Sequence, residues 1–393
     1  MSEIKVNSIK GVAASSAAIT VNNTDGTCTA NLTNRTNKNL VVNGACLIAQ
    51  RGTSSTSTGY QTVDRFQFSK GGTDETPTQQ QISLDSSDTG PYETGFRKAY
   101  KITNGNQTSG AGTSDNIIVF RYHIEAQDIA NSGWNYTSSS SNVTLQFWIK
   151  SSVAQSFQGV LTSEDGTRQI FPFATGSLSA DTWTKITKTI PGNSNITFDN
   201  DNGKGLTLEI IGFSGSDYAT DSETINAWQA RTSANQFGRA STSTWYTTND
   251  ATLEMTGFQL EVGSVATDFE HRSFAQELAL CQRYFFNILG DNQDYIGVYG
   301  FANSSSSLRC VVNFPVPMRA MPTFEGSATS MTLDSSDDST AFNISTFAVG
   351  RAHTSPNPIS CCIENDPGGM TAGQGGQLET KADNGFLNFS AEL

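Results

Sequence analysis

The sequence predicts an all-β protein that consists of an N-terminal arm, an antiparallel jelly-roll-like β-sandwich, one connecting helix and a smaller C-terminal β domain. Three observations lead to this prediction. Between residues 40 and 271, about ten short segments alternate apolar and polar residues with a period of two, and turn residues separate them. One helical pattern follows these segments. After it, a second series of short alternating segments runs to residue 393.

Residues 1–39 form the predicted arm. They are rich in Asn, Thr, Ala and Ser, with isolated Ile and Val residues. A segment of this length cannot bury a core of its own, so we expect it either to be disordered or to dock on something larger.

The sandwich is assigned to residues 40–271. In residues 143–150 every second side chain is apolar, and these side chains face one way: Val143, Leu145, Phe147 and Ile149. In residues 253–262 the apolar phase changes after Gly257, which is typical of a β-bulge. Parallel strands would need helical crossovers, and no helical pattern lies in this region, so the sheets are predicted to be antiparallel.

The connecting helix is assigned to residues 272–289, with its pattern running from Ser273 to about Asn287. Ser273 and Gln276 have the spacing of a capping box. One apolar stripe follows at helical spacing: Phe274, Leu278, Cys281 and Phe285. This stripe could form a seam between subunits or pack inside one subunit, and the sequence leaves both open.

The C-terminal domain is assigned to residues 290–393. About 100 residues are enough to hold a separate core. Pro315 and Pro317 lack a backbone donor, so the end of the strand that contains them is expected at a sheet edge.

Composition excludes several classes of protein. The net charge is −13 and only 16% of the residues are charged, with no basic run. Binding to a nucleic-acid backbone is therefore not expected. No apolar run approaches the roughly 20 residues of a membrane-spanning helix, so membrane insertion is not expected either.

Motifs for catalysis, cofactors and metals are missing from the sequence. There is no nucleophile elbow and no phosphate-binding loop. The six cysteines and three histidines do not have zinc-site spacing. We therefore predict no catalytic residue, no cofactor and no metal, and we interpret the cysteines as small buried thiols.

Two aromatic pairs occur in polar loop sequences, Trp134 with Tyr136 and Trp245 with Tyr246. Flat rings beside hydroxyl and amide groups are typical of glycan-binding sites, because sugar CH groups stack on the ring while sugar hydroxyls take the hydrogen bonds. These four residues are the candidate glycan-binding residues. The alternative is that the rings pack onto the sandwich or a neighbouring subunit.

Several motifs occur in order along the chain, at residues 39–45, 50–52, 60, 64–66, 257–263, 266–272, 277–285, 314–323 and 389–393. They resemble the opening of a sandwich domain, its closing strand and helix, and the following C-terminal domain of bacteriophage tail-fibre proteins. Residues 1–10 are similar to the virion-attachment arms of marine phage fibres. The sandwich is expected to resemble a carbohydrate-binding module.

This resemblance implies a virion protein that is assembled in the host cytoplasm. It implies a homotrimeric fibre whose N-terminal arm binds other tail or adaptor proteins of the particle. Its β domains would recognise a host cell-surface polysaccharide, without enzymatic activity.

Two alternative functions stay open at this point. The chain could be a purely structural head or tail decoration fibre, whose contacts are all with virion proteins. It could also be a polysaccharide depolymerase, which two carboxylates facing each other across a cleft would support.

Overall fold

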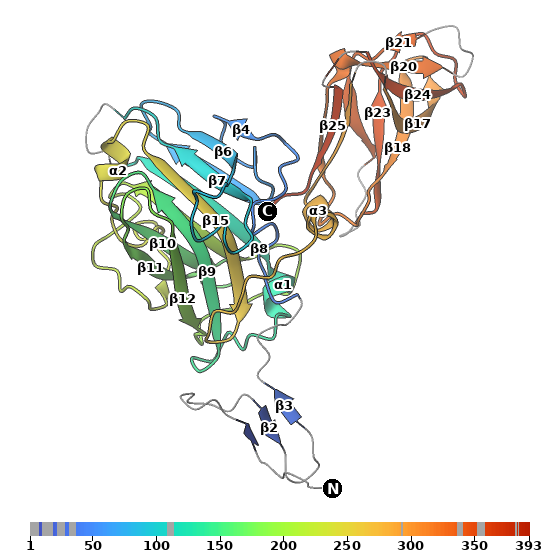
Figure 1. The fold of residues 1–393 in the computed structure, drawn as a ribbon. Coiled ribbons are helices and arrows are strands. Elements are labelled where there is room, and N and C mark those ends of the chain that lie inside the picture. Colours follow the sequence, from blue (N-terminus) through green and yellow to red (C-terminus); the bar gives the residue numbers. More distant parts are fainter. Residues whose placement is uncertain are drawn as a thin grey trace.

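The computed structural model describes residues 8–9, 19–21, 28–30, 37–107, 114–291, 294–335, 341–351, 358–381, 383 and 385–393. Nearly all regular structure in these residues is antiparallel β-strand, which confirms the predicted fold class (Figure 1). The helices are short: α1 (Ala126–Ala130), α2 (Thr244–Thr247) and α3 (Phe274–Gln282).

Two six-stranded sheets form the sandwich. The first has the order β14-β11-β10-β13-β8-β5 and the second β12-β9-β15-β7-β6-β4. The first sheet contains β5 (Phe66–Gly71), β8 (Ile117–Glu125), β10 (Ser156–Ser163), β11 (Gln169–Ser177), β13 (Lys204–Ser214) and β14 (Gln229–Ala230). The second contains β4 (Ser54–Ser55), β6 (Thr78–Ser83), β7 (Lys98–Thr103), β9 (Asn142–Ser151), β12 (Thr184–Pro191) and β15 (Thr252–Val262).

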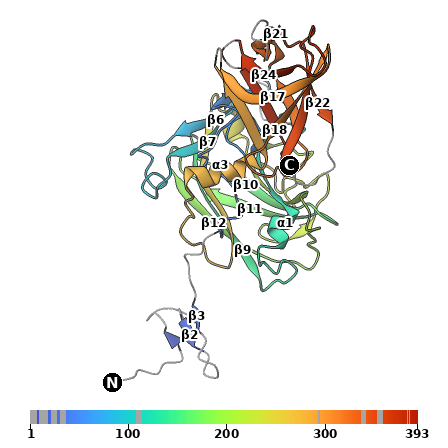
Figure 2. The ribbon, with the colours of Figure 1, turned by 90° about the vertical axis from the view of Figure 1, so that its right-hand side faces the viewer.

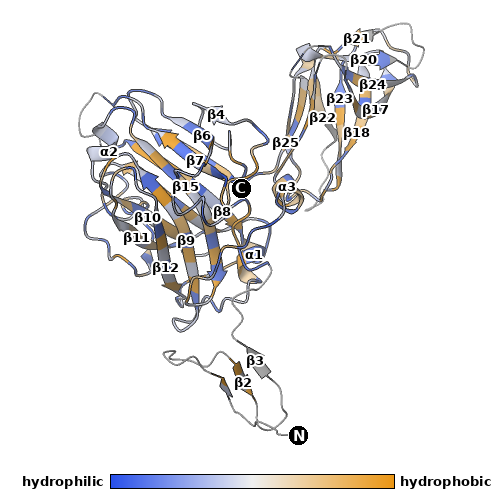
Figure 3. Ribbon diagram, in the orientation of Figure 1, coloured by the Kyte–Doolittle hydropathy of each residue, from blue (hydrophilic) through white to orange (hydrophobic). Residues whose placement is uncertain are grey.

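The core of the sandwich lies between the inner faces of these sheets. Phe120 of the first sheet stacks on Phe258 of the second, with 5.1 Å between ring centroids, and Phe258 stacks in turn on Phe147 at 5.1 Å. Burying each such ring contributes roughly 1.5–3 kcal/mol. Apolar residues follow the strands of both sheets in Figure 3, as the period of two predicts.

The predicted bulge is present in β15. The register shifts between Thr256 and Gln259, and Gly257 has a φ of +69°. A Cβ at Gly257 would lie 2.7 Å from the ring of Phe96, so only glycine fits without displacement. The bulge turns Phe258 into the core.

The described part of the arm forms a separate small sheet. Its strands are β1 (Ser8–Ile9), β2 (Ile19–Val21) and β3 (Cys28–Ala30), paired in the order β1-β2-β3. In both views this sheet lies beyond the sandwich, at the end of the molecule opposite the C-terminal sheets (Figures 1 and 2).

The connecting helix is shorter than predicted. Its capping box is confirmed, because the Ser273 side chain accepts from the Gln276 backbone and the Gln276 side chain accepts from the Ser273 backbone. The helix ends at Gln282 and not near Asn287. Residues beyond Tyr284 pair with a strand a hundred residues later, so tertiary pairing overrides the helical pattern.

Two sheets form the C-terminal part. A three-stranded sheet has the order β16-β25-β19, and a seven-stranded sheet has the order β21-β20-β24-β17-β18-β23-β22. The first contains β16 (Phe285–Gly290), β19 (Thr323–Gly326) and β25 (Gly385–Ser390). The second contains β17 (Tyr295–Ser304), β18 (Ser307–Asn313), β20 (Met331–Ser335), β21 (Ala341–Asn343), β22 (Phe347–Arg351), β23 (Ser360–Asn365) and β24 (Gly375–Thr380).

A buried arginine joins the end of the chain to the sandwich. The Arg65 guanidinium is ion-paired with Glu392 and lies 3.4 Å from the ring centroid of Tyr284. It also donates to the carbonyl of His123 at 2.7 Å. Burial is the largest single effect and lowers the pKa of Arg65, but Glu392 and the neighbouring Tyr284, Tyr122 and Tyr60 together raise it, and the pKa lies well above its usual value. The arginine therefore stays charged, and the ion pair fixes residues 391–393 on the sandwich.

Two further polar contacts support this junction. Arg283 makes a two-pronged ion pair with the buried Glu125, with N···O distances of 2.7 and 2.8 Å. Arg319 donates to the carbonyl of Asn202 at 2.7 Å, and the Asn202 amide donates to the carbonyl of Arg319 at 2.6 Å. These contacts connect the C-terminal part to the sandwich at several separate points.

Replacing Arg65 by methionine should lower the free energy of unfolding by about 3 kcal/mol, because it leaves the Glu392 carboxylate buried beside fewer cations. Urea unfolding followed by tryptophan fluorescence measures this. The control is Arg168→Met, whose ion pair with Glu164 involves a half-exposed guanidinium and should contribute less than about 1 kcal/mol. Equal losses for the two variants would contradict a central role for Arg65.

Candidate functional site

Three of the four predicted glycan-binding residues belong to the core. Trp245 and Tyr246 are completely buried, and Trp134 is nearly so. Their polar atoms bond inside the chain: the Trp245 indole donates to Thr252 O at 3.0 Å, and the Tyr246 hydroxyl accepts from Asn116 at 2.7 Å. A ring packed on both faces cannot stack on a sugar, so the prediction is wrong for Trp134, Trp245 and Tyr246.

Tyr136 is partly buried. Its ring meets Phe198 edge-on, with 4.7 Å between centroids, and lies 6.3 Å from Trp134. This is the packing alternative that the sequence left open.

The predicted apolar stripe of the helix divides into two halves. Cys281 and Phe285 are buried inside the chain, and the Arg51 guanidinium lies 3.5 Å from the centre of the Phe285 ring. Subunit contact is therefore the wrong interpretation for these two. Phe274 is 58% exposed and Leu278 is half-buried, so both remain accessible to another chain.

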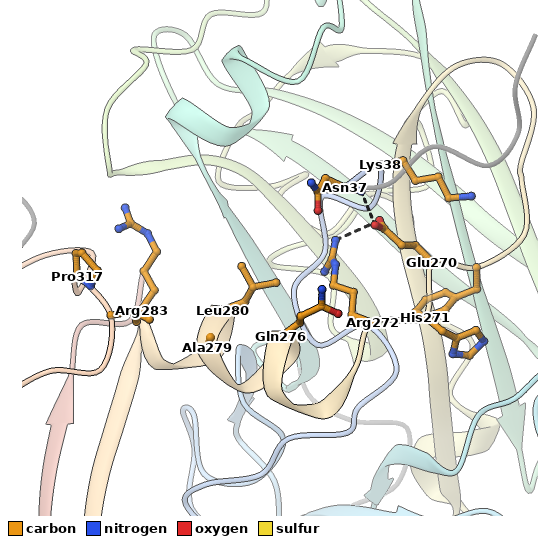
Figure 4. Close-up of a pocket in the computed structure, with 12 residues that line it drawn as sticks. Asn37, Lys38, Glu270, His271, Arg272, Gln276, Ala279, Leu280, Arg283 and Pro317 are labelled. Carbon is orange, nitrogen blue, oxygen red and sulfur yellow. Dashed lines mark hydrogen bonds and ion pairs between the residues drawn. The ribbon is translucent and has the colours of Figure 1, made fainter. Parts of the chain in front are cut away.

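A groove of about 880 Å³ lies beside α3 (Figure 4). The helix contributes Gln276, Ala279 and Leu280 to its lining. On the side of the groove opposite the helix, Glu270 links two segments. Its carboxylate accepts from the Asn37 backbone and pairs with Arg272 at 3.3 Å. The start of the sandwich, its last segment, α3 and residues 316–317 meet at this groove.

Three further exposed aromatic residues lie on β17. Tyr295, Tyr299 and Phe301 are 59%, 62% and 56% exposed, whereas Val298 and Ala302 of the same strand are buried. Val311 of the neighbouring β18 is also exposed, and the pairing of Gly300 with Cys310 places it beside Tyr299. We call this surface, made of Tyr295, Tyr299, Phe301 and Val311, the aromatic face.

Two glycines of β24 leave the β24 side of the Phe301 ring free of side chains. Gly375 of β24 pairs with Phe301, and Gly376 pairs with Gly300. A residue directly across the ladder projects on the same side of the sheet, so a larger side chain at 375 would stand beside the Phe301 ring. With glycine there, that flank of the ring is open.

Hydrogen-bonding groups border the aromatic face on both sides. On the β20 and β24 side, the Tyr295 hydroxyl and the Gln377 amide donate to Asp334 at 3.4 and 3.5 Å. On the β23 side, Glu364 accepts from the Ser307 hydroxyl and lies 3.9 Å from Arg309 Nε. Exposed rings thus lie between two rows of donors and acceptors.

Sequence reasoning missed this surface. The sequence predicts a strand at residues 294–301, but the candidate glycan-binding residues were aromatic residues of polar loops, and none of them lies on this strand. The sequence signal that indicates this surface is that both faces of the strand are apolar. Aromatic rings stand at 295, 299 and 301, and aliphatic residues at 296, 298 and 302. A strand that is apolar on both faces must be covered on both or must bind something.

The described residues contain no group of three or more His, Cys, Asp or Glu side chains placed to hold a metal ion. No helix in the described part of the chain is long and apolar enough to cross a membrane. The cysteines with described side chains are free thiols: Cys46, Cys281, Cys310, Cys361 and Cys362.

Comparison with protein-family models gives no match, and neither does comparison with curated proteins. Among solved structures, the enzymatically active domain of tailspike protein 4 of bacteriophage CBA120 is similar over 57% of this chain and 21% of its own, with 10% identity and a TM-score of 0.30. The family 11 carbohydrate-binding module of Clostridium thermocellum matches over 56% and 98%, with 10% identity and a TM-score of 0.24. A putative sugar-binding protein of Bacteroides thetaiotaomicron matches over 57% and 100%, with 11% identity and a TM-score of 0.28. At these TM-scores, interpretation of the surface depends on the residues of this chain alone.

Trp245→Ala should destabilise the sandwich by about 3–5 kcal/mol, because it leaves a cavity in the core and removes a buried hydrogen bond. Tyr299→Ala, on the aromatic face, should change the free energy of unfolding by less than about 1 kcal/mol. Thermal or urea unfolding of both variants tests the assignment. A mild effect of Trp245→Ala would mean that this ring is not in the core.

Proposed function

We propose that this chain is a fibre subunit of a phage particle that recognises a host cell-surface polysaccharide, and that the aromatic face makes the contact. The observation that carries the proposal is a row of three rings on one strand, each more than half exposed and bordered by hydrogen-bonding side chains.

The chemistry of a polysaccharide fits this surface. Sugar rings present CH groups on their faces and hydroxyls around their edges. The CH groups can stack on Tyr299 and Phe301, while hydroxyls reach Asp334, Gln377 and Glu364 at the borders. The rings stand on a strand inside a seven-stranded sheet, so little backbone freedom is lost on binding.

Assignment to a phage fibre rests on the motif resemblance along residues 39–393. The shape of the molecule supports it, because the N-terminal strands and the seven-stranded sheet that carries the aromatic face lie at opposite ends (Figures 1 and 2). In the proposed arrangement the arm binds tail or adaptor proteins of the virion, and the aromatic face points towards the host. We propose binding without catalysis.

A homotrimer is part of this proposal. The exposed Phe274, the half-buried Leu278 and the groove beside α3 support a contact between subunits there. Three copies in one fibre would raise the effective affinity for a repetitive polysaccharide by roughly 10²–10⁴ when all copies can bind together.

The double variant Tyr299→Ala/Phe301→Ala should lose polysaccharide binding. We expect about a 10-fold loss of affinity for each ring removed, equivalent to about 1.4 kcal/mol. Binding to an array of bacterial surface polysaccharides, and adsorption of the protein to host cells, measure this. Tyr299→Phe should bind nearly as well as the wild type, since it keeps the stacking surface.

The matched control is Leu289→Ala, which removes an exposed apolar side chain of β16 that lies outside the aromatic face. It should leave polysaccharide binding unchanged. If the double variant binds like the wild type, the aromatic face is not the recognition site. If the double variant instead changes the oligomeric mass, the aromatic face is a contact between subunits. That result would favour the purely structural function.

Phe274→Ser combined with Leu280→Ser should convert the trimer to monomers, because both changes place hydroxyls in the proposed contact. Light scattering after size-exclusion chromatography measures the mass. A monomeric wild-type protein at micromolar concentration would refute the trimer, and a trimeric double variant would refute this contact.

A further inference from the structure

Two carboxylates stand on the β20 and β24 side of the aromatic face, Asp334 of β20 and Glu379 of β24. Glu379 is directly across the ladder from Tyr295. Asp334 is directly across from Gln377, which in turn is the ladder partner of Tyr299. Residues directly across a ladder project on the same side of a sheet, so both carboxylates belong to the outer face that carries the rings.

Both carboxylates are accessible to a ligand. The side chains of Asp334 and Glu379 are partly exposed. Asp334 Oδ2 accepts from the Tyr295 hydroxyl at 3.4 Å and from the Gln377 amide at 3.5 Å, and both of these donors are neutral. Asp334 Oδ1 and the Glu379 carboxylate keep accessible surface and have no hydrogen-bond partner among the described residues. A ligand that stacks on Tyr295 therefore lies next to both carboxylates.

No cation with a described side chain pairs with these two carboxylates. Lys381 follows β24, but its ammonium donates to Asn343 of β21 at 2.8 Å. In the strand order β21-β20-β24-β17, this places the ammonium on the side of β24 away from Tyr295. Arg309 of β18 lies on the opposite side of β17, where it is the ladder partner of Glu364 and lies 3.9 Å from it. The β20 and β24 side of the aromatic face is therefore negatively charged.

Two physical effects make this side of the face selective. An ionised carboxylate can only accept hydrogen bonds, so it can bind sugar hydroxyls, which donate. A carboxylate or phosphate group on the ligand would bring a second acceptor and a second negative charge to the same place. Such a juxtaposition of like charges is unfavourable, and interfaces often gain specificity by repelling the wrong partner.

We propose that the aromatic face selects neutral polysaccharides over acidic ones, and that Asp334 and Glu379 determine this specificity. The inference rests on the proposed function, because it concerns the ligand of the same surface. It adds the class of polysaccharide, one whose sugar at Tyr295 carries no carboxylate, phosphate or sulfate group.

The test compares each polysaccharide with its own acidic derivative. Neutral polysaccharides that bind the full chain on the array are oxidised at their primary hydroxyls, which converts CH₂OH groups to carboxylates and keeps the linkages. Biolayer interferometry measures both affinities. We expect the oxidised polymer to bind at least about 10-fold more weakly at about 0.02 M salt. The difference should shrink to about 3-fold or less at about 1 M salt, where charges are screened beyond about 3 Å.

The double variant Asp334→Asn/Glu379→Gln should remove most of this discrimination. Because Asp334 also lies where sugar hydroxyls bind, the readout is the ratio of the neutral to the oxidised affinity. We expect this ratio to fall from at least about 10 to about 3 or less. Glu379→Gln alone should lower the ratio by a smaller factor, and it serves as the test if the double variant does not fold.

The matched control is Glu325→Gln/Asp221→Asn, which removes two exposed carboxylates outside the aromatic face. It changes the net charge by the same amount as the double variant and should leave the ratio unchanged. An equal fall of the ratio in this control would assign the discrimination to the net charge of −13, and it would overturn the inference.

Three other results would overturn the inference and leave the proposed function standing. They are equal affinity for a neutral polymer and its oxidised form, binding of acidic polysaccharides alone on the array, and an unchanged ratio in both Asp334→Asn/Glu379→Gln and Glu379→Gln. In all three cases binding would still depend on Tyr299 and Phe301. Absence of all binding, or binding that the Tyr299→Ala/Phe301→Ala variant retains, would instead refute the proposed function and this inference with it.

Discussion

The buried ion pair between Arg65 and Glu392 is the interaction on which the arrangement of the two β parts depends. These residues are 327 positions apart, so the pair closes almost the whole described chain into one unit. Moving two charges out of water is strongly unfavourable unless other groups compensate. Here the Tyr284 ring, the His123 carbonyl and the nearby Arg51 guanidinium do so. The last residue is held too, since the Tyr60 hydroxyl donates to the Leu393 carbonyl at 2.8 Å.

This junction gives the C-terminal sheet a defined direction relative to the sandwich. A recognition surface benefits from such rigidity, because less conformational freedom is lost when a ligand binds. The same junction leaves a groove beside α3 where four segments of the chain meet. The aromatic face and the groove therefore lie on separate parts of one framework.

Aromatic residues illustrate how burial, and not residue type, decides function. Trp245 lies in a polar loop sequence but folds back onto the core, where its indole finds a carbonyl partner. Tyr299 lies in a strand but points outward, because the pleat alternates and Val298 takes the inner position. Local polarity around a ring was thus a poor guide to its exposure. The alternation within residues 295–302 was the better one, since it follows directly from strand geometry.

By itself the sequence determined the local structure: the alternating strands, the bulge at Gly257 and the capping box at Ser273 all depend on neighbouring residues. Only the tertiary structure decided where α3 ends, because β16 pairs with a strand a hundred residues later. It also decided which rings are exposed and which cations pair with Glu392. The physical reason is that burial and strand pairing depend on contacts between segments far apart in the chain. A local sequence pattern contains no information about those contacts.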